Sequence, residues 1–113
     1  MNKIVNIIKP TGMTSHDVVS AVRKILNTKK VGHTGTLDPD ASGVLPICIG
    51  KATKVSELIL NKDKSYICEL TLGITTDTYD SSGEILERVD NFSFTKEEIE
   101  KAFDTQRGHI DQL

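Results

Sequence analysis

Hydrophobic and polar positions along the chain predict short strands and helices. Residues 4–8 are mainly β-branched, and Pro10-Thr11-Gly12 follows them, so a strand that ends in a turn is expected. Over 15–27 the apolar residues recur at helical spacing on a single face, which comprises Val18, Val22, Ile25 and Leu26. Thr14 or Ser15 supplies the cap of this helix.

Similar patterns continue downstream, where Pro46 interrupts one apolar run. Proline in that position indicates an edge strand, an irregularity or a late strand start. A Thr95-x-x-Glu98 capping box, with Phe94 and Ile99 as its hydrophobic staple, begins the last predicted helix. The further predicted elements are a strand at 44–49, a helix at 51–60, a half-buried strand at 65–72, a short strand at 84–89 after a turn at 80–83, and a helix at 95–104.

Residues 110–113 have the pattern of one more strand. Strands and helices intermix without a regular βαβ repeat, which predicts an α+β fold. No apolar run approaches the roughly 18 residues of a membrane-spanning helix. Cys48 and Cys68 have neither CxxC spacing nor a disulfide framework. A cytoplasmic protein without membrane association is therefore expected.

Residues 31–43 show neither helical nor strand periodicity, which predicts a long structured loop, and such loops are usually functional. Pro39 holds Asp38 in an extended conformation, because the residue before proline is disfavoured in the helical region. Asp38 is thus well placed to meet a ligand. The residues alone leave open a second interpretation, in which this aspartate only caps or turns the loop. The segment also contains glycines that allow backbone conformations closed to other residues: Gly32, Gly35 and Gly43.

The two halves of the chain differ in charge, although the net charge is −2. Residues 1–64 carry ten Lys/Arg against five Asp/Glu, a net +5, while 65–113 carry four against eleven, a net −7. This asymmetry indicates a polyanion bound on one side, with solvated helix faces and loops as the alternative interpretation. The basic residues form two groups: Arg23, Lys24, Lys29 and Lys30, then Lys51, Lys54, Lys62 and Lys64.

Three strings stand in order along the first part of the chain. Residues 6–19 read NIIKPTGMTSHDVV, residues 31–54 read VGHTGTLDPDASGVLPICIGKATK, and residues 63–66 read DKSY. Together they resemble the TruB family of tRNA pseudouridine synthases, matching its KPxGxTS motif, its central signature and its lysine-x-tyrosine strand. The resemblance covers most of residues 4–83. It implies part of a catalytic domain built on a mixed, largely antiparallel sheet with flanking helices.

The resemblance implies a role for each matched residue. Asp38 corresponds to the catalytic nucleophile, and Tyr66 to the tyrosine that stacks on the target base and helps to remove a proton. His33 corresponds to the histidine that holds the flipped nucleotide; without the family, Tyr66 reads as a core residue and His33 as a structural one. Lys9 and Pro10 correspond to a motif that supports the catalytic loop. The expected substrate-binding residues are His33, Lys9, Lys29, Lys30 and Arg23, and the expected structural ones are Pro10, Gly32, Gly35, Pro39 and Gly43.

The implied reaction converts uridine 55 in the T-arm of tRNA to pseudouridine. It breaks the N1–C1′ bond, rotates the base and rejoins it through C5. An ionised aspartate is a competent nucleophile at either C1′ or C6, and the residues do not choose between them. The base leaves its stack, so that a loop residue such as His33 can fill the space and an aromatic ring can receive the base. No metal or cofactor is expected.

Members of the family are more than twice as long as this chain. The chain is therefore expected to be the N-terminal portion of the catalytic domain, without the rest of that domain or the C-terminal RNA-binding domain. We expect a monomeric full-length enzyme that binds a T-arm stem-loop, and an inactive fragment that self-associates through an exposed sheet. Dyskerin-type relatives, which use guide RNA, share the motifs, but the HTGTLDP string and the early start favour the stand-alone bacterial branch.

Two other functional classes stay open. Asp38-Pro39-Asp40-Ala41-Ser42 fits the DxDx(T/S/V) pattern of Mg²⁺-dependent aspartyl phosphotransferases, although no continuous apolar strand precedes it. A non-enzymatic RNA-binding module is the second. The chain has no GxxxxGK(S/T) phosphate-binding string, and the acidic residues at 77–84 miss the spacing of an EF-hand.

Overall fold

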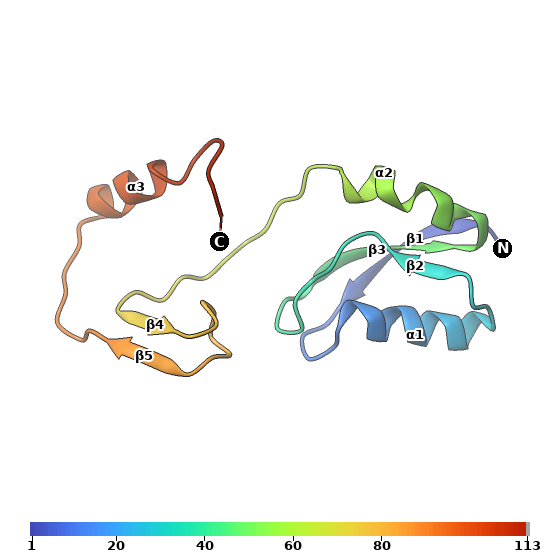
Figure 1. The fold of residues 1–113 in the computed structure, drawn as a ribbon, viewed down its shortest axis with the longest axis horizontal. Coiled ribbons are helices and arrows are strands. Elements are labelled where there is room, and N and C mark those ends of the chain that lie inside the picture. The colour runs from blue at the N-terminus through green and yellow to red at the C-terminus, as the bar shows by residue number, and fades with distance from the viewer. Residues whose placement is uncertain (113) are drawn as a thin grey trace. The chain divides into compact units, whose positions relative to one another are not determined.

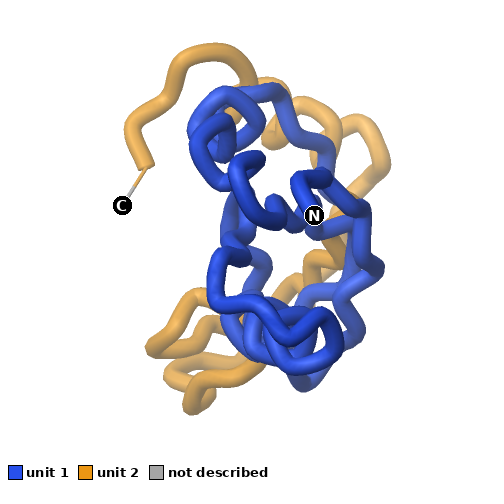
Figure 2. Tube along the Cα trace, turned by 90° about the vertical axis from the view of Figure 1, so that its right-hand side faces the viewer, with its two compact units in different colours: residues 1–66 blue, residues 67–113 orange. Residues whose placement is uncertain are grey.

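The computed structural model describes residues 1–112 of the chain. It has two compact units, residues 1–66 and residues 67–113, which Figure 2 colours separately. Both units combine helices with antiparallel strands, so the predicted α+β class is confirmed. All residues predicted to form the site lie in the first unit. Within the described part of the chain, no helix is both long and apolar enough to cross a membrane.

A three-stranded antiparallel sheet forms the centre of the first unit (Figure 1). Its strands lie in the order β1 (Lys3–Lys9), β3 (Gly43–Ile49) and β2 (Val31–His33). β1 pairs with β3 along its whole length, whereas β2 pairs only with the last part of β3. The strands predicted at 4–8 and 44–49 are confirmed. β2 lies in the segment predicted to be a loop, because three residues are too few to show a period of two.

Helix α1 (Ser15–Leu26) packs on this sheet and has a capping box at its start. The Asp17 N–H donates to Thr14 Oγ1 at 3.0 Å, and the Thr14 N–H donates to the Asp17 carboxylate at 2.9 Å. Asn27 ends the helix in the left-handed conformation, with a φ of 50°. The predicted helix is confirmed, and Thr14 rather than Ser15 is its cap.

The core of the first unit lies between α1 and the sheet. Val18 and Val22 are buried as predicted, but Ile25 is 79% exposed, so the predicted apolar face does not extend to the end of the helix. Each fully buried aliphatic side chain contributes about 1.5–3 kcal/mol to holding the helix on the sheet. The buried cluster comprises Val18, Val19 and Val22 from α1 with Val31, Leu45, Ile47 and Ile49 from the strands.

Pro46 lies in the central strand rather than at an edge, which corrects one of the interpretations offered above. The Thr34 N–H donates to the Pro46 carbonyl at 3.2 Å, and the Thr34 hydroxyl donates to it at 3.1 Å. A hydrogen-bonded antiparallel pair exchanges two N–H···O bonds, and proline lacks the donor for the second. β2 therefore ends at His33, one residue before this incomplete pair.

The helix predicted at 51–60 forms in two parts, a 3₁₀ segment (Gly50–Val55) and helix α2 (Ser56–Leu60). Thr53 Oγ1 donates to the Gly50 carbonyl at 2.9 Å, and Ser56 Oγ donates to the Thr53 carbonyl at 3.0 Å. Hydroxyl groups that bind carbonyls three residues back compete with the i to i−4 bonds of an α-helix. The segment is helical as predicted, but the prediction of one regular α-helix over 51–60 is wrong.

The half-buried strand predicted at 65–72 does not form. Among residues 1–112 no strand pairs with this segment, and its side chains are largely exposed. Alternation of apolar and polar residues specifies which face of a strand is buried, but a strand also needs a partner for its backbone groups.

The second unit contains a two-stranded hairpin of β4 (Ile74–Thr76) and β5 (Ile85–Arg88), with a bulge between Thr75 and Thr76. The strand at 84–89 and the turn at 80–83 are confirmed, and β4 was not predicted. Asp80 organises the turn, since its carboxylate accepts hydrogen bonds from the Ser82 and Thr78 hydroxyls and the Ser82 N–H. The hydrogen bond from the Ser82 hydroxyl contributes most to lowering the pKa of Asp80.

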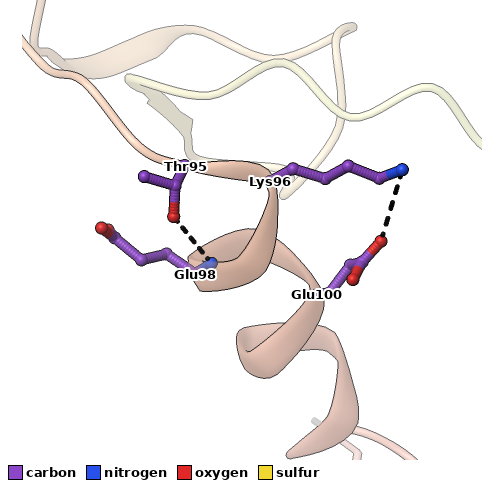
Figure 3. Close-up of polar contacts among 4 residues, drawn as sticks. All are labelled: Thr95, Lys96, Glu98 and Glu100. Atoms are coloured by element: carbon purple, nitrogen blue, oxygen red, sulfur yellow. Dashed lines mark hydrogen bonds and ion pairs between the residues drawn. The ribbon is translucent and has the colours of Figure 1, made fainter.

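Helix α3 (Lys96–Asp104) confirms the last predicted helix. Figure 3 shows Thr95 Oγ1 accepting the Glu98 N–H at 3.2 Å, with the Glu98 carboxylate directed elsewhere, so only half of the predicted capping box forms. Lys96 and Glu100 form an exposed ion pair at 3.8 Å in the same view. Residues 110–112 are not a strand, and residue 113 of that prediction lies outside the described residues.

Candidate active-site loop

Residues 34–42 connect the paired strands β2 and β3 and carry Asp38 near their centre. Asp38 is exposed, and its carbonyl accepts the Ala41 N–H at 2.9 Å, which closes a turn over 38–41. The second interpretation of the sequence, a turn-forming aspartate, is correct for the backbone of this residue. Its carboxylate is nevertheless free to face solvent, so the backbone turn and a chemical role of the side chain are compatible.

The residue before Asp38 is held by helix α1. The Leu37 N–H donates to Ser15 Oγ at 2.9 Å, and the Ser15 hydroxyl lies 3.2 Å from the Leu37 carbonyl, to which it donates. Ser15 is only 2% exposed, and the Leu37 side chain packs against the buried core. Sequence reasoning considered Ser15 only as a possible cap. The signal for another role is that two adjacent hydroxyl residues, Thr14 and Ser15, stand at the start of the helix, and only one of them can be its cap.

The residue after Asp38 is held by the end of β1 and the turn that follows it. The Pro39 carbonyl accepts the Gly12 N–H at 2.7 Å and the Lys9 ammonium at 3.4 Å. Lys9 Nζ also donates to the carbonyls of Pro10 at 2.8 Å and Met13 at 2.7 Å. Gly12 has a φ of +86°, where glycine is favoured because it has no Cβ.

Lys9 is completely buried, and its ammonium group is occupied by backbone carbonyls. The expectation that Lys9 binds the substrate directly is therefore corrected, because its charged group has no exposed surface. Its contacts are those of a residue that supports the loop, and Pro10 takes part through its carbonyl. These contacts agree with the supporting role that the KPxGxTS motif implied, which stays a prediction.

His33 ends strand β2 and is half-buried, with its Nδ1 at 2.6 Å from the Gly35 carbonyl. Gly35 and Gly43, on the two sides of Asp38, have φ values of +144° and +156°. Gly32 has neither a positive φ nor a neighbour within 4 Å of where a Cβ would be, so the structure gives no conformational reason for a glycine there.

A pocket of about 470 Å³ lies next to the loop, within the first unit. Tyr66, which is 67% exposed, contributes to its wall together with Thr36 and Leu37 of the loop. Asp38 and His33 are not part of the wall. The structure therefore brings Tyr66 near the loop that carries Asp38, but not into one closed site with Asp38 and His33.

The predicted basic residues differ in accessibility. Lys29 and Lys30 are exposed in the connection between α1 and β2. Arg23 is half-buried, and its Nη2 donates to the Val31 carbonyl at 3.1 Å, so that it links α1 to β2. Arg23 is thus a structural contact rather than an exposed member of the basic group. Among residues 1–112, no three His, Cys, Asp or Glu side chains lie together in a way that could hold a metal ion.

Known proteins resemble this chain over its whole length. Residues 23–113 match the family model described as TruB family pseudouridylate synthase (N terminal domain). A protein of Clostridioides difficile (strain 630) named tRNA pseudouridine synthase B is 83% identical over all of this chain, which covers 38% of that protein. The protein of the same name from Bacillus subtilis (strain 168) is 49% identical, and the chain covers 37% of it. The chain thus spans less than two fifths of the length of these curated relatives.

A chain in the structure of an H/ACA RNP bound to a substrate RNA containing 2′-deoxyuridine is also similar. It is 55% identical to this chain with a TM-score of 0.47, and the match covers 49% of this chain and 17% of that chain.

Proposed function

The chain belongs to the TruB family of pseudouridylate synthases, and on this premise we propose that it is the N-terminal portion of the catalytic domain of a tRNA pseudouridine synthase. The observation that carries the proposal is the 83% identity, over all 113 residues, to a protein named tRNA pseudouridine synthase B. The proposed activity is that of the full-length enzyme, because the chain covers 38% of that relative.

The proposed reaction is the conversion of uridine 55 in the T-arm of tRNA to pseudouridine, with Asp38 as the nucleophile. Asp38 attacks C1′ or C6 of the target nucleotide, the N1–C1′ bond breaks, and the base rotates so that C5 bonds to C1′. The bond to Asp38 then breaks, which returns the free carboxylate, and the proton on C5 is lost. The exposure of Asp38 supports this role, since a nucleophile must reach its substrate. The hydrogen bonds on Leu37 and Pro39 support it further, because a fixed backbone on both sides limits the positions of the carboxylate.

The target uridine is proposed to leave its stack before it reacts. Tyr66 receives the flipped base and assists proton removal, and the exposure of its ring beside the pocket supports that role. His33 fills or borders the space that the base has left. Lys29 and Lys30 contact the RNA backbone, in agreement with their exposure and the positive charge of residues 1–64.

The test of this proposal is the release of tritium from C5-labelled uridine in a T-arm stem-loop. Asp38→Asn in the full-length enzyme is expected to abolish release while changing RNA affinity only a few-fold. Asp40→Asn is the matched control, because it removes an exposed carboxylate two residues away in the same loop, and it is expected to retain turnover. Substantial release by Asp38→Asn would refute the nucleophile assignment, and complete inactivation by a chelator would contradict the metal-free reaction.

A further inference from the structure

The start of helix α1 has two adjacent hydroxyl side chains with separate partners. Thr14 caps the helix by accepting the Asp17 N–H, and Asp17 returns the bond to the Thr14 N–H. The N-terminus of α1 is therefore capped without the Ser15 side chain. The Ser15 hydroxyl is bonded instead to a residue 22 positions away, in the loop that carries Asp38.

Ser15 binds both backbone groups of one residue. Its Oγ accepts the Leu37 N–H at 2.9 Å and donates to the Leu37 carbonyl at 3.2 Å, which uses the single donor and one acceptor site of a serine hydroxyl. Leu37 thus has both of its polar backbone groups bonded to one side chain, although the loop has no partner strand at this point. The Leu37 carbonyl belongs to the peptide bond that joins Leu37 to Asp38.

We propose that Ser15 is a positioning residue for Asp38: its hydroxyl fixes the Leu37–Asp38 peptide and thereby the position of the Asp38 Cα atom, from which the side chain extends. This inference rests on the proposed role of Asp38 as the nucleophile. Ser15 holds Leu37 from the start of α1, while Gly12 and Lys9 hold Pro39, so the aspartate lies between two fixed neighbours along the chain. Small displacements of a reacting group lower the rate of a reaction strongly, and they do so without weakening distant substrate contacts.

A purely structural role predicts different behaviour. Ser15 is buried, so its removal destabilises the protein to some extent in either case. Structural destabilisation lowers the melting temperature but leaves the turnover of molecules that remain folded almost unchanged. A positioning role lowers kcat in fully folded enzyme, with KM for the stem-loop retained, and increases the mobility of residues 34–42.

The experiment compares three variants of the full-length enzyme, all assayed well below their melting temperatures. Ser15→Ala removes the hydroxyl and Ser15→Thr retains one. Val19→Ala is the stability control, because Val19 is equally buried in α1 and belongs to the core rather than to the loop contacts. The readouts are kcat and KM for tritium release, the melting temperature, and hydrogen exchange of the 34–42 backbone.

Ser15→Ala is expected to lower kcat on the order of ten- to a hundred-fold, with KM within about two-fold of wild type. Faster exchange in 34–42 should accompany the loss, and Ser15→Thr should recover most of kcat. Val19→Ala should lower the melting temperature while keeping kcat within about two-fold. A near-normal kcat in Ser15→Ala, a Ser15→Ala protein that does not fold, or an equal loss of kcat in Val19→Ala would each overturn the inference.

The same measurements, taken together with the Asp38→Asn assay of the proposed function, distinguish a failure of this inference from a failure of the function on which it rests. If Asp38→Asn retains turnover, the nucleophile assignment fails even when exchange in 34–42 rises in Ser15→Ala. If Asp38→Asn is inactive and Ser15→Ala behaves like Val19→Ala, only the positioning role of Ser15 fails.

Discussion

The ammonium nitrogen of Lys9 lies 3.4 Å from the carbonyl oxygen of Pro39, thirty residues further along the chain. This contact joins the end of β1 to the residue that follows Asp38. A buried charge normally carries a large desolvation penalty unless it is fully hydrogen-bonded. Here three carbonyls, those of Pro10, Met13 and Pro39, surround the ammonium group, so the strand and the loop are held by a charge-assisted contact.

Replacing Lys9 with methionine should therefore destabilise the full-length enzyme by at least about 2 kcal/mol, because the three carbonyls lose a charged donor. Urea unfolding measures the change. Lys3→Met is the control: Lys3 lies in the same strand but is exposed, and its replacement should shift stability by less than about 0.5 kcal/mol. Equal effects of the two substitutions would contradict the proposed support of the loop.

Gly12→Ala should also loosen the loop, since Gly12 has a φ of +86° and donates to Pro39. An L-residue in that conformation costs about 1–2 kcal/mol. Gly32→Ala is the matched control, because Gly32 has no positive φ and open space around the position of a Cβ. Thermal unfolding should show a lower midpoint for Gly12→Ala alone; a similar shift in both variants would argue against the conformational explanation.

Exchange of Lys29 and Lys30 for glutamine should weaken binding of a T-arm stem-loop and reduce its dependence on salt. Two lost phosphate contacts lower the slope of log affinity against log salt concentration by about 1.4–1.8. Lys96→Gln with Lys101→Gln is the control, because both lysines are exposed on α3 in the acidic part of the chain. If both pairs change the slope equally, the positive charge of residues 1–64 does not define the RNA-binding surface.

The capping box of α1 predicts a dependence of stability on pH. Hydrogen bonds from the Thr14 N–H and hydroxyl lower the pKa of Asp17, with the backbone bond as the larger cause. A carboxyl group whose pKa is lower in the folded state stabilises it above the unfolded pKa of about 3.9, and this stabilisation is lost as pH falls through the folded pKa. The difference in melting temperature between wild type and Asp17→Asn should thus be largest near neutral pH and vanish in strong acid.

Introducing Asp17→Asn into a Thr14→Ala protein tests whether the change in melting temperature comes from the capping box. Without the Thr14 hydroxyl, Asp17→Asn should have a smaller effect at neutral pH, because one of the reciprocal bonds is already lost. A difference between wild type and Asp17→Asn that stays constant from neutral to strongly acidic pH would exclude ionisation of Asp17 as its cause.

The isolated 113-residue polypeptide is expected to self-associate and to show no turnover. No residue between 67 and 112 is buried, and large apolar side chains in this range, among them Ile67, Leu70 and Phe94, are more than half exposed. Exposed apolar surface on this scale promotes association. Light scattering measures the first expectation and tritium release the second; a monomeric, active polypeptide would contradict both.

Local signals in the sequence were sufficient to predict some elements of the structure. The amphipathic pattern and the hydroxyl residues at 14–15 predicted α1, and the β-branched run predicted β1. The segment at 65–72 has equally clear alternation but forms no strand, because its outcome depends on a partner that no local pattern reveals. Asp38 and Tyr66 were selected through the family motifs. Ser15 was missed because its partner, Leu37, is 22 residues away.

Pro46 has a consequence for how the polypeptide folds. A strand can slide along its partner by two residues and keep the same side chains facing the core, so burial alone does not exclude such a slip. In any register, the β2 residue that stands opposite Pro46 in a hydrogen-bonded pair finds no donor there for its own carbonyl. The native alignment places Thr34 at this position, and the Thr34 hydroxyl adds a second hydrogen bond to the Pro46 carbonyl. A slip that brought Gly32 opposite Pro46 would lose this added bond, so the pairing of Thr34 with Pro46 favours the native registration of the hairpin, and with it the residue that reaches the tip of the loop.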